Sequence, residues 1–323
     1  MKDSIIAGLD VGSNNIRLVV GQKVENGLNI IGLAETASVG ISKGIINSVE
    51  DAVSCIAEAE EKAERMTGAP IEKAYIAISG VHIISSASRG VIAIAKADGE
   101  IREDDVERVI EAAQTISSPP NYEVLHVIPL TFAVDNQKDI RDPIGMNGIR
   151  LEVEVLIIQG LSTQIKNLTK VVYRAGLDVE DLVVGVLASA EAVLSKRQKE
   201  LGAAVLNIGS STASLAVFEE GDVIYTKIIP VGSAHITSDL AIGLRSSLDT
   251  AEEIKIKYGN ANPQTIDKRE DIDLSNITEG EISVVSRRHT AEIIEARVEE
   301  IFKLADSELA KIEKSGKLPA GII

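Results

Sequence analysis

The sequence lacks tryptophan and has only three phenylalanines and five tyrosines among 323 residues. Its core must therefore be built from isoleucine, valine, leucine and alanine. The shortage of aromatic rings argues against a protein that binds nucleic acid by base stacking. The net charge of −16 argues the same way, because contact with phosphates needs clustered lysine and arginine. We therefore expect no nucleic-acid partner.

Cysteine and long hydrophobic runs are also scarce. The single cysteine, Cys55, excludes a disulfide scaffold and a cysteine-ligated zinc site, and it fits a reducing cytoplasm. The four histidines are scattered, and none lies at metal-ligand spacing from another. The longest mostly apolar run, residues 182–194, contains Glu191 and is too short to span a bilayer. The apolar stretch near the N-terminus is too short for a signal peptide.

What remains is the composition of an ordinary folded protein, with 45% hydrophobic and 25% charged residues. At about 100–200 residues per domain, this length suggests two domains or a bilobed body. Buried-strand runs alternate with helical periodicities, which indicates an α/β protein. The elements that we predict include a strand over 5–11, a helix over 49–66 with Ser48 as N-cap, a hairpin over 84–100, and a single helix over 187–200. Residues 318–323 have the pattern of a strand that begins, so we expect a longer parent protein with its C-terminal part missing here.

An internal repeat contains the candidate phosphate-binding residues. The stretch LDVGSNNIRLVV (9–20) aligns with LNIGSSTASLAV (206–217) without a gap, and leucine, glycine and serine recur in register. Each copy runs from a buried strand through a polar glycine turn into a second strand. Glycine lets backbone N–H groups approach a phosphate closely, and serine, asparagine and threonine add donors. Two such turns suggest a phosphate clamp between two lobes, although a pair of ordinary hairpin turns is the alternative.

These two turns resemble the phosphate-binding loops of the actin, DnaK-type chaperone and sugar-kinase superfamily. Within it, the chain resembles the FtsA family of bacterial cell-division proteins. The segments DPIGMNG (142–148) and HITSDLAIGL (235–244) carry the more specific part of this resemblance, and the similar stretches spread over residues 8–302. The resemblance implies an actin-like bilobed α/β fold with two similar mixed-sheet domains and an inserted subdomain typical of that family. The domains that it implies are a first lobe of 1–82 and 162–195, the insertion 83–161, a second lobe of 196–233 and 305–323, and a helical subdomain 234–304.

The resemblance also implies that ATP lies between the two turns, with Mg²⁺ held by Asp10 through water. Glu252 and Lys255, one helical turn apart, match the family's adenosine contacts, although a solvated salt bridge is the alternative. The residues that the resemblance assigns to nucleotide binding are Asp10, Gly12, Ser13, Asn14, Asn15, Gly209, Ser210, Ser211, Thr212, Gly232, Glu252 and Lys255.

The second turn departs from the family pattern Asp-x-Gly-Gly-Gly-Thr. Asn207 stands where the family has aspartate, and Ser210 and Ser211 replace two glycines. Asparagine offers no negative charge toward Mg²⁺, so we expect at most a weak ATPase and assign no catalytic residue. A sugar or metabolite kinase on the same fold is an alternative, but it needs a carboxylate base, and Asn207 counts against it.

The function that the resemblance implies is an ATP-binding protein that polymerises at the membrane and tethers the tubulin-like protein FtsZ to the division septum. Its partners would be the C-terminal tail of FtsZ, docked on residues 233–301, other division proteins, and further copies of itself. It would lie on the cytoplasmic face of the cell membrane at the division site. The family's membrane-binding C-terminal helix and adenosine loop are absent from this sequence, so we expect poor nucleotide binding and no membrane binding by these residues alone. An adaptor of pilus or cell-shape machinery is the alternative.

Overall fold

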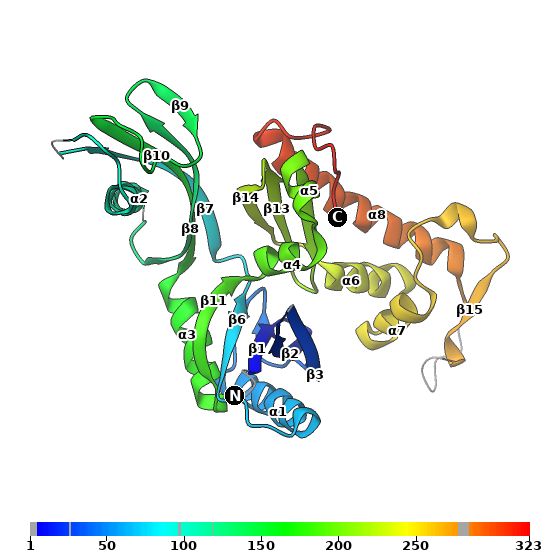
Figure 1. The fold of residues 1–323 in the computed structure, drawn as a ribbon. Helices are drawn as coiled ribbons and strands as arrows, with labels where there is room; N and C mark the ends of the chain where they lie inside the picture. Colours follow the sequence, from blue (N-terminus) through cyan, green and yellow to red (C-terminus); the bar gives the residue numbers. More distant parts are fainter. Residues whose placement is uncertain (1–4, 26, 96–97, 118, 277–283) are drawn as a thin grey trace. The chain divides into compact units, whose positions relative to one another are not determined.

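The computed structural model describes residues 5–25, 27–95, 98–117, 119–276 and 284–323. They form two compact units, drawn in Figure 1. The first unit comprises residues 1–207, 214–228 and 318–323, and the second comprises residues 208–213 and 229–317.

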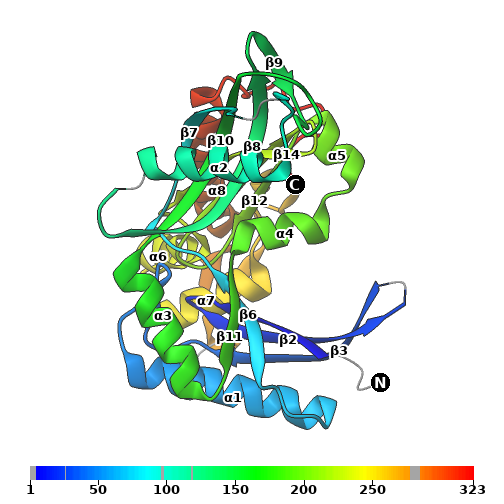
Figure 2. The same ribbon diagram turned by 60° about the vertical axis from the view of Figure 1, so that its left-hand side comes forward.

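A five-stranded mixed sheet organises the first unit. Its strand order is β11-β6-β1-β2-β3. Strand β1 is antiparallel to β2 and parallel to β6, while β2 is antiparallel to β3 and β6 is parallel to β11. Figures 1 and 2 show these strands side by side. The strands are β1 (Ile5–Val11), β2 (Asn15–Val24), β3 (Gly27–Ala37), β6 (Lys73–Ile78) and β11 (Asp178–Val184), and a separate short hairpin is formed by β4 (Ile41–Ser42) and β5 (Ile45–Ile46).

Helices α1 (Val49–Thr67) and α3 (Ser162–Ala175) pack with this sheet into one core, and α1 contacts β2 and β3. Helix α1 ends at Gly68, whose φ of 66° is a left-handed conformation that glycine adopts at low cost. Ser48 precedes α1 as predicted, but its side chain makes no capping hydrogen bond. The buried residues of the sheet and of α1 follow the spacings expected for a strand and a helix, and they include Ala7, Leu9, Val11, Ile16, Leu18, Val20, Ala52, Ile56, Ala59 and Ala63.

The segment between β6 and α3 has a sheet of its own, with strand order β7-β10-β8-β9. The predicted hairpin over 84–100 is wrong, because β7 is one continuous strand that pairs with β10 along its length. Gly90 lies within β7, where a Cβ atom would come 2.1 Å from the carbonyl oxygen of Val109 in α2. This glycine therefore serves close helix packing rather than a turn. The elements are β7 (Ile83–Ala93), α2 (Glu103–Ser117), β8 (Tyr122–Val134), β9 (Gln137–Ile140) and β10 (Arg150–Leu161).

The single helix predicted over 187–200 is also wrong. The structure has two helices there, α4 (Gly185–Val193) and α5 (Lys196–Leu201). Ser195 starts α5 with a capping box: its hydroxyl accepts the backbone N–H of Gln198 at 3.3 Å, and its own N–H donates to the Gln198 side chain at 2.9 Å.

A three-stranded sheet follows, made of β12 (Ala203–Ile208), β13 (Ala213–Glu219) and β14 (Asp222–Ile229). The end of the chain pairs with it, because Ile322 forms a parallel bridge with Ala204 and the N–H of Leu206 donates to the Ile323 carbonyl at 2.9 Å. The strand-like pattern predicted for residues 318–323 is thus confirmed only for the last residues, because residues 318–321 form a turn in which the Gly321 N–H donates to the Leu318 carbonyl at 3.0 Å.

The second unit is mostly helical. Helices α6 (Ser233–Leu244), α7 (Leu248–Tyr258) and α8 (Arg287–Lys311) pack around a small core that includes Ile236, Leu240, Ala251 and Ile294. None of the helices within the described ranges is long and apolar enough to cross a membrane. The shorter elements of this unit are η1 (Pro263–Thr265), β15 (Asp271–Asp273), η2 (Leu274–Asn276) and β16 (Val284–Ser286).

Candidate functional site

The first polar turn, residues 12–15, joins β1 to β2. A Cβ atom on Gly12 would lie 2.6 Å from the carbonyl oxygen of Asn15, so the turn closes too tightly for any larger residue without movement. The carbonyl of Asn14 accepts the N–H of Ser38 at 2.8 Å. The backbone N–H groups of Ser13 and Asn14 have no hydrogen-bond partner within the described residues. The turn is therefore fixed through a backbone carbonyl, and the N–H groups of Ser13 and Asn14 remain available to bind an anion.

A row of polar side chains crosses the sheet beside this turn. Asp10 faces Arg17 across β1 and β2, and Arg17 faces Glu35 across β2 and β3. Arg17 Nε lies 2.8 Å from Glu35 Oε2, and the Asn15 side-chain amide donates to Glu35 Oε1 at 2.6 Å. Asn15 is thus anchored to β3 by its side chain, which fixes the shape of the turn.

Asp10 stands at the end of β1, next to the turn. Its carboxylate reaches solvent, but the surrounding protein replaces part of its hydration and raises its pKa, an effect that the nearby Arg17 guanidinium opposes. Among the described residues, no cluster of three histidine, cysteine, aspartate or glutamate side chains could hold a metal ion. The Asp10 carboxylate reaches solvent, and a carboxylate oxygen is a ligand that suits Mg²⁺, an ion that keeps several of its waters.

The second polar turn, residues 209–212, is closed by a hydrogen bond from the Gly209 N–H to the Thr212 carbonyl at 2.9 Å. It rests on the N-terminus of α6. The N–H groups of Ser233 and Ala234 donate to the carbonyls of Gly209 and Ser210 at 2.9 and 2.8 Å. The helix thereby satisfies two of its own free N-terminal donors and orients the turn. The amides of Ser210 and Ser211 have no partner in the described part of the chain.

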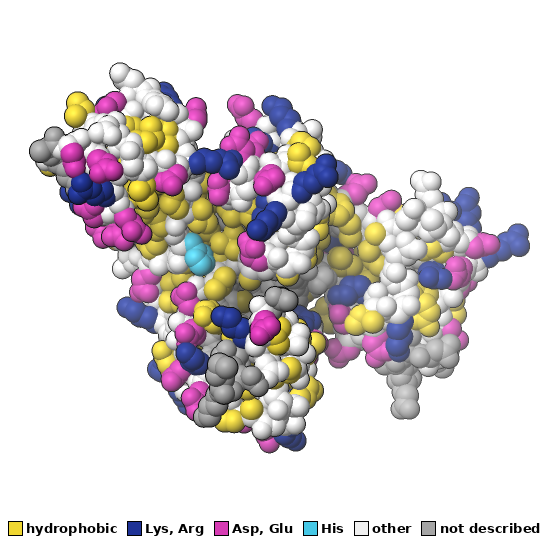
Figure 3. All heavy atoms as spheres, in the orientation of Figure 1, with side chains coloured by type: hydrophobic (Ala, Val, Ile, Leu, Met, Phe, Trp, Pro, Cys, Tyr) yellow, Lys and Arg dark blue, Asp and Glu magenta, His cyan; other side chains and the backbone are white. Residues whose placement is uncertain are grey.

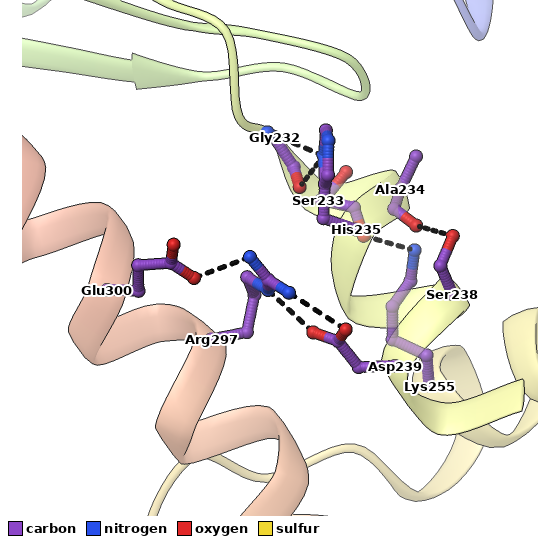
Figure 4. Close-up of polar contacts among 9 residues, drawn as sticks. All are labelled: Gly232, Ser233, Ala234, His235, Ser238, Asp239, Lys255, Arg297 and Glu300. Carbon is purple, nitrogen blue, oxygen red and sulfur yellow. Dashed lines mark hydrogen bonds and ion pairs between the residues drawn. The ribbon is translucent and has the colours of Figure 1, made fainter. Parts of the chain in front are cut away.

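Gly232 makes this contact possible. A Cβ atom there would lie 2.5 Å from the carbonyl oxygens of both Gly209 and Ser210. Its φ of −150° is ordinary extended backbone, so lack of space and not strain requires the glycine. The His235 ring nitrogen Nδ1 accepts the Gly232 N–H at 3.2 Å, as Figure 4 shows. Of the residues assigned from the sequence, the structure brings Gly209, Ser210 and Gly232 into direct contact.

Asn207, the residue that departs from the family pattern, ends β12. Its side-chain amide donates to the Ser189 hydroxyl at 3.3 Å, and that hydroxyl donates to the Gly185 carbonyl at 3.0 Å. The amide therefore links β12 to α4. Sequence reasoning identified Asn207 but not its partner Ser189.

Glu252 and Lys255 form an ion pair at 2.6 Å on α7. Lys255 also donates to the Thr237 hydroxyl at 2.9 Å and to the Ser233 carbonyl at 3.5 Å, and Thr237 in turn donates to Glu252. Only 17% of the Lys255 side chain is exposed, so a fully solvated salt bridge does not describe this pair. It ties α7 to the first turns of α6, next to Gly232. Sequence reasoning missed Thr237. Its position one helical turn after Ser233, on the same face of the predicted helix, could have indicated that both residues contact Lys255.

A second charged contact joins α6 to α8. Arg297 makes a two-pronged ion pair with Asp239, at 2.5 and 2.8 Å, and contacts Glu300 at 2.5 Å. Figure 4 shows both acceptors around the guanidinium. The sequence reasoning did not identify the contact between Arg297 and Asp239, which lie in different helices.

The Glu252 contacts predict a pH dependence of stability. Partial burial alone would raise the pKa of Glu252, but hydrogen bonds from Lys255 and Thr237 and the Lys255 charge outweigh it, so the pKa is lowered. The stabilisation is therefore present above the ordinary glutamate pKa of about 4.3 and is lost as pH falls through the lower, folded-state value. Urea unfolding at about pH 6 and pH 3.5 should show a larger loss for the wild type than for Glu252→Gln.

The control for this prediction is Glu253→Gln on the same helix, which breaks an exposed ion pair with Lys257. It should follow the wild type. An equal loss of stability in the wild type and in Glu252→Gln would contradict the prediction.

Comparison with known proteins gives the family. Residues 204–318 match the family described as "Cell division protein FtsA", and residues 80–159 match "SHS2 domain inserted in FTSA". The chain is 37% identical over 321 residues to the cell division protein FtsA of Bacillus subtilis, covering 99% of this chain and 73% of the relative. This chain belongs to the FtsA family. The family resemblance predicted from the sequence is thus confirmed.

Solved structures confirm the actin-like fold. The structure titled "PilM-PilN type IV pilus biogenesis complex" matches with a TM-score of 0.65 at 16% identity, over 96% of this chain and 78% of the other. MreB5 of Spiroplasma citri, solved bound to ADP, matches with a TM-score of 0.50 at 13% identity, over 95% and 78% of the two chains. At these identities the likeness shows the fold alone. The FtsA-family segment at residues 80–159 covers the sheet β7-β10-β8-β9 except for the last two residues of β10.

Proposed function

We propose that this FtsA-family chain binds ATP and acts as an actin-like adaptor in cell division. The observation that carries the proposal is the pair of repeated turns, residues 12–15 and 209–212, each of which has two backbone N–H groups without a partner among the described residues. Each turn also depends on a glycine, Gly12 or Gly232, where a Cβ atom would force neighbouring atoms to move. Free, oriented amides are suitable donors for phosphate oxygens. The fold neighbour MreB5, solved with ADP, is consistent with this role.

The residues that would hold the nucleotide are those assigned from the sequence. Ser13 and Asn14 would offer amides on one turn and Ser210 and Ser211 on the other, while Gly232 keeps the second turn seated on α6. Mg²⁺ would be bound by Asp10 through water, since a carboxylate that reaches solvent suits an ion that keeps several waters. Glu252 and Lys255 would contact the adenosine. Titration of the protein with a fluorescent ATP analogue, with and without Mg²⁺, tests the proposal, and no saturable binding would reject it.

We propose further that hydrolysis is weak at most. Asn207 offers neither negative charge nor a proton-accepting oxygen that is basic enough to activate water. A sugar kinase would need such a base, so the same residue argues against that alternative. Of the two adaptor alternatives, the pilus protein resembles this fold more than MreB5 does, with TM-scores of 0.65 and 0.50. The 37% sequence identity to FtsA nevertheless favours the FtsA role.

The partners in this proposal are the C-terminal tail of FtsZ, docked on the second unit, further copies of the chain, and other division proteins at the cytoplasmic face of the membrane. Helices α6 and α7 expose large apolar side chains, with Ile242 78% and Ile256 71% exposed. Figure 3 shows hydrophobic side chains at the surface in this region. Such side chains suit the apolar face of a docked helix.

The docking proposal predicts that Ile256→Glu weakens binding of an FtsZ tail peptide by about tenfold, since one lost apolar anchor costs on the order of 1–2 kcal/mol. Fluorescence anisotropy with a labelled peptide measures this. Val193→Glu, a charge added at an exposed apolar position of α4 in the first unit, is the matched control and should leave binding unchanged. Equal affinities for all three proteins would place the docking surface elsewhere.

A further inference from the structure

Strand β3 is an exposed edge of the five-stranded sheet. Figure 2 shows it beside β2, and no other strand in the described part of the chain pairs with its outer side. Its residues 28–34 contain neither a charge nor a proline. Leu28, Ile30 and Leu33 are 48%, 60% and 54% exposed. An edge with these features is open to pairing with another strand.

The outward backbone groups of β3 can be located. The Glu35 carbonyl accepts a hydrogen bond from Lys62 of α1 at 3.3 Å, so Glu35 directs this group away from β2. Because backbone groups alternate along an antiparallel strand, Leu33 also directs its N–H and C=O outward. Ile31 is skipped at the bulge in the β2–β3 ladder. The outer side therefore offers unpaired donors and acceptors in the uncharged segment 28–34.

The opposite edge of the same sheet, β11, has charged residues, which usually prevent an edge strand from pairing with another chain. Strand β11 has Asp178, Glu180 and Asp181 within seven residues, and Glu180 is paired with Lys73 at 2.5 Å. Acidic residues on an edge oppose pairing with an apolar strand and with a second copy of themselves. The contrast within one sheet shows that only one of its edges is guarded by charge.

We propose that β3 is an interface between two copies of this chain. The two β3 strands pair antiparallel about a two-fold axis at Ile31, the middle of the uncharged segment, and join the two sheets into one. In this arrangement residues 28–34 of one copy lie opposite residues 34–28 of the other, so no like charges meet. Glu35, at the end of the segment, is already neutralised by Arg17.

A second copy fits this edge better than the other occupants that the sheet offers. Head-to-tail pairing of β3 with β11 of another copy would place apolar residues against Asp178 and Asp181. An isologous β3 pair places apolar residues against apolar residues and closes after two copies. It therefore differs from the head-to-tail self-association expected of the family.

The test is the molar mass of the 323-residue protein without nucleotide, by sedimentation equilibrium over about 1–100 µM. We expect a monomer–dimer equilibrium that Ile30→Lys weakens by at least about tenfold, because it adds a charge to each copy near the two-fold axis. Ile149→Lys, at an exposed residue of the loop before β10, is the matched control and should dimerise as the wild type. A wild-type monomer at 100 µM, or dimers that persist in Ile30→Lys, would overturn the proposal.

Cross-linking gives a second, independent measurement. In a Cys55→Ser background, Ile31→Cys should form a disulfide dimer under mild oxidation, because the two-fold axis brings residue 31 of both copies together. Val193→Cys, exposed on α4, should cross-link only at the rate of random collision. Equal rates for the two variants would reject pairing centred on Ile31.

Discussion

Replacing Gly232 by alanine is expected to weaken ATP binding by about 10- to 100-fold, because relief of an overpacked contact typically costs 1–3 kcal/mol. The added Cβ atom would lie 2.5 Å from two carbonyl oxygens, those of Gly209 and Ser210. These same carbonyls accept the N–H groups of Ser233 and Ala234. The turn must therefore move away from α6 and lose the bonds that orient its free amides toward phosphate.

The measurement is titration with a fluorescent ATP analogue, accompanied by thermal unfolding to show that the variant is folded. The matched control is Gly8→Ala in β1, where an added Cβ atom would meet no atom within 4 Å and φ is not positive. Gly8→Ala should bind as the wild type. If a folded Gly232→Ala protein bound ATP with unchanged affinity, the second turn would not be a phosphate-binding element.

The two turns were predictable from sequence because their chemistry is local. A glycine followed by small polar residues, between two apolar runs, determines both the turn and its exposed donors. The second turn was found because residues 206–217 repeat the pattern of residues 9–20. What the sequence could not supply was the support of the second turn, since Gly232 lies beyond two further strands and acts only through contact with Gly209 and Ser210.

The wrong predictions have physical causes of the same kind. The hairpin over 84–100 was predicted from a local pattern, but residues 83–93 form one strand in which Gly90 lets α2 pack against the β7 backbone, a tertiary contact. The break between α4 and α5 was different, because Ser195 and Gln198 are a capping-box pair visible in the sequence. The residues after that break, KRQKE (196–200), all have high helix propensity, and this concealed the break. The expected assignment of residues 196–233 to a second lobe stays a prediction.

Restoring a carboxylate at position 207 is expected to raise ATP turnover at least about tenfold, a small part of the 10²–10⁴-fold that a positioned base typically contributes. Asparagine and aspartate have the same shape, so the side chain should keep its place at the end of β12. Only its chemistry changes: the amide that donates to Ser189 at 3.3 Å becomes a carboxylate, to which the Ser189 hydroxyl can donate if it turns away from the Gly185 carbonyl.

Phosphate release at saturating ATP and Mg²⁺ measures the effect of Asn207→Asp. Asn207→Ala is the matched control, because it removes the same link to Ser189 without supplying a charge, so any loosening of β12 from α4 appears in both variants. A rise in turnover confined to Asn207→Asp would assign the low activity of the wild type to the missing carboxylate. If both variants hydrolysed ATP as slowly as the wild type, the cause would lie instead in Ser210 and Ser211, which replace the two glycines of the family pattern and restrict how closely the backbone can approach a phosphate.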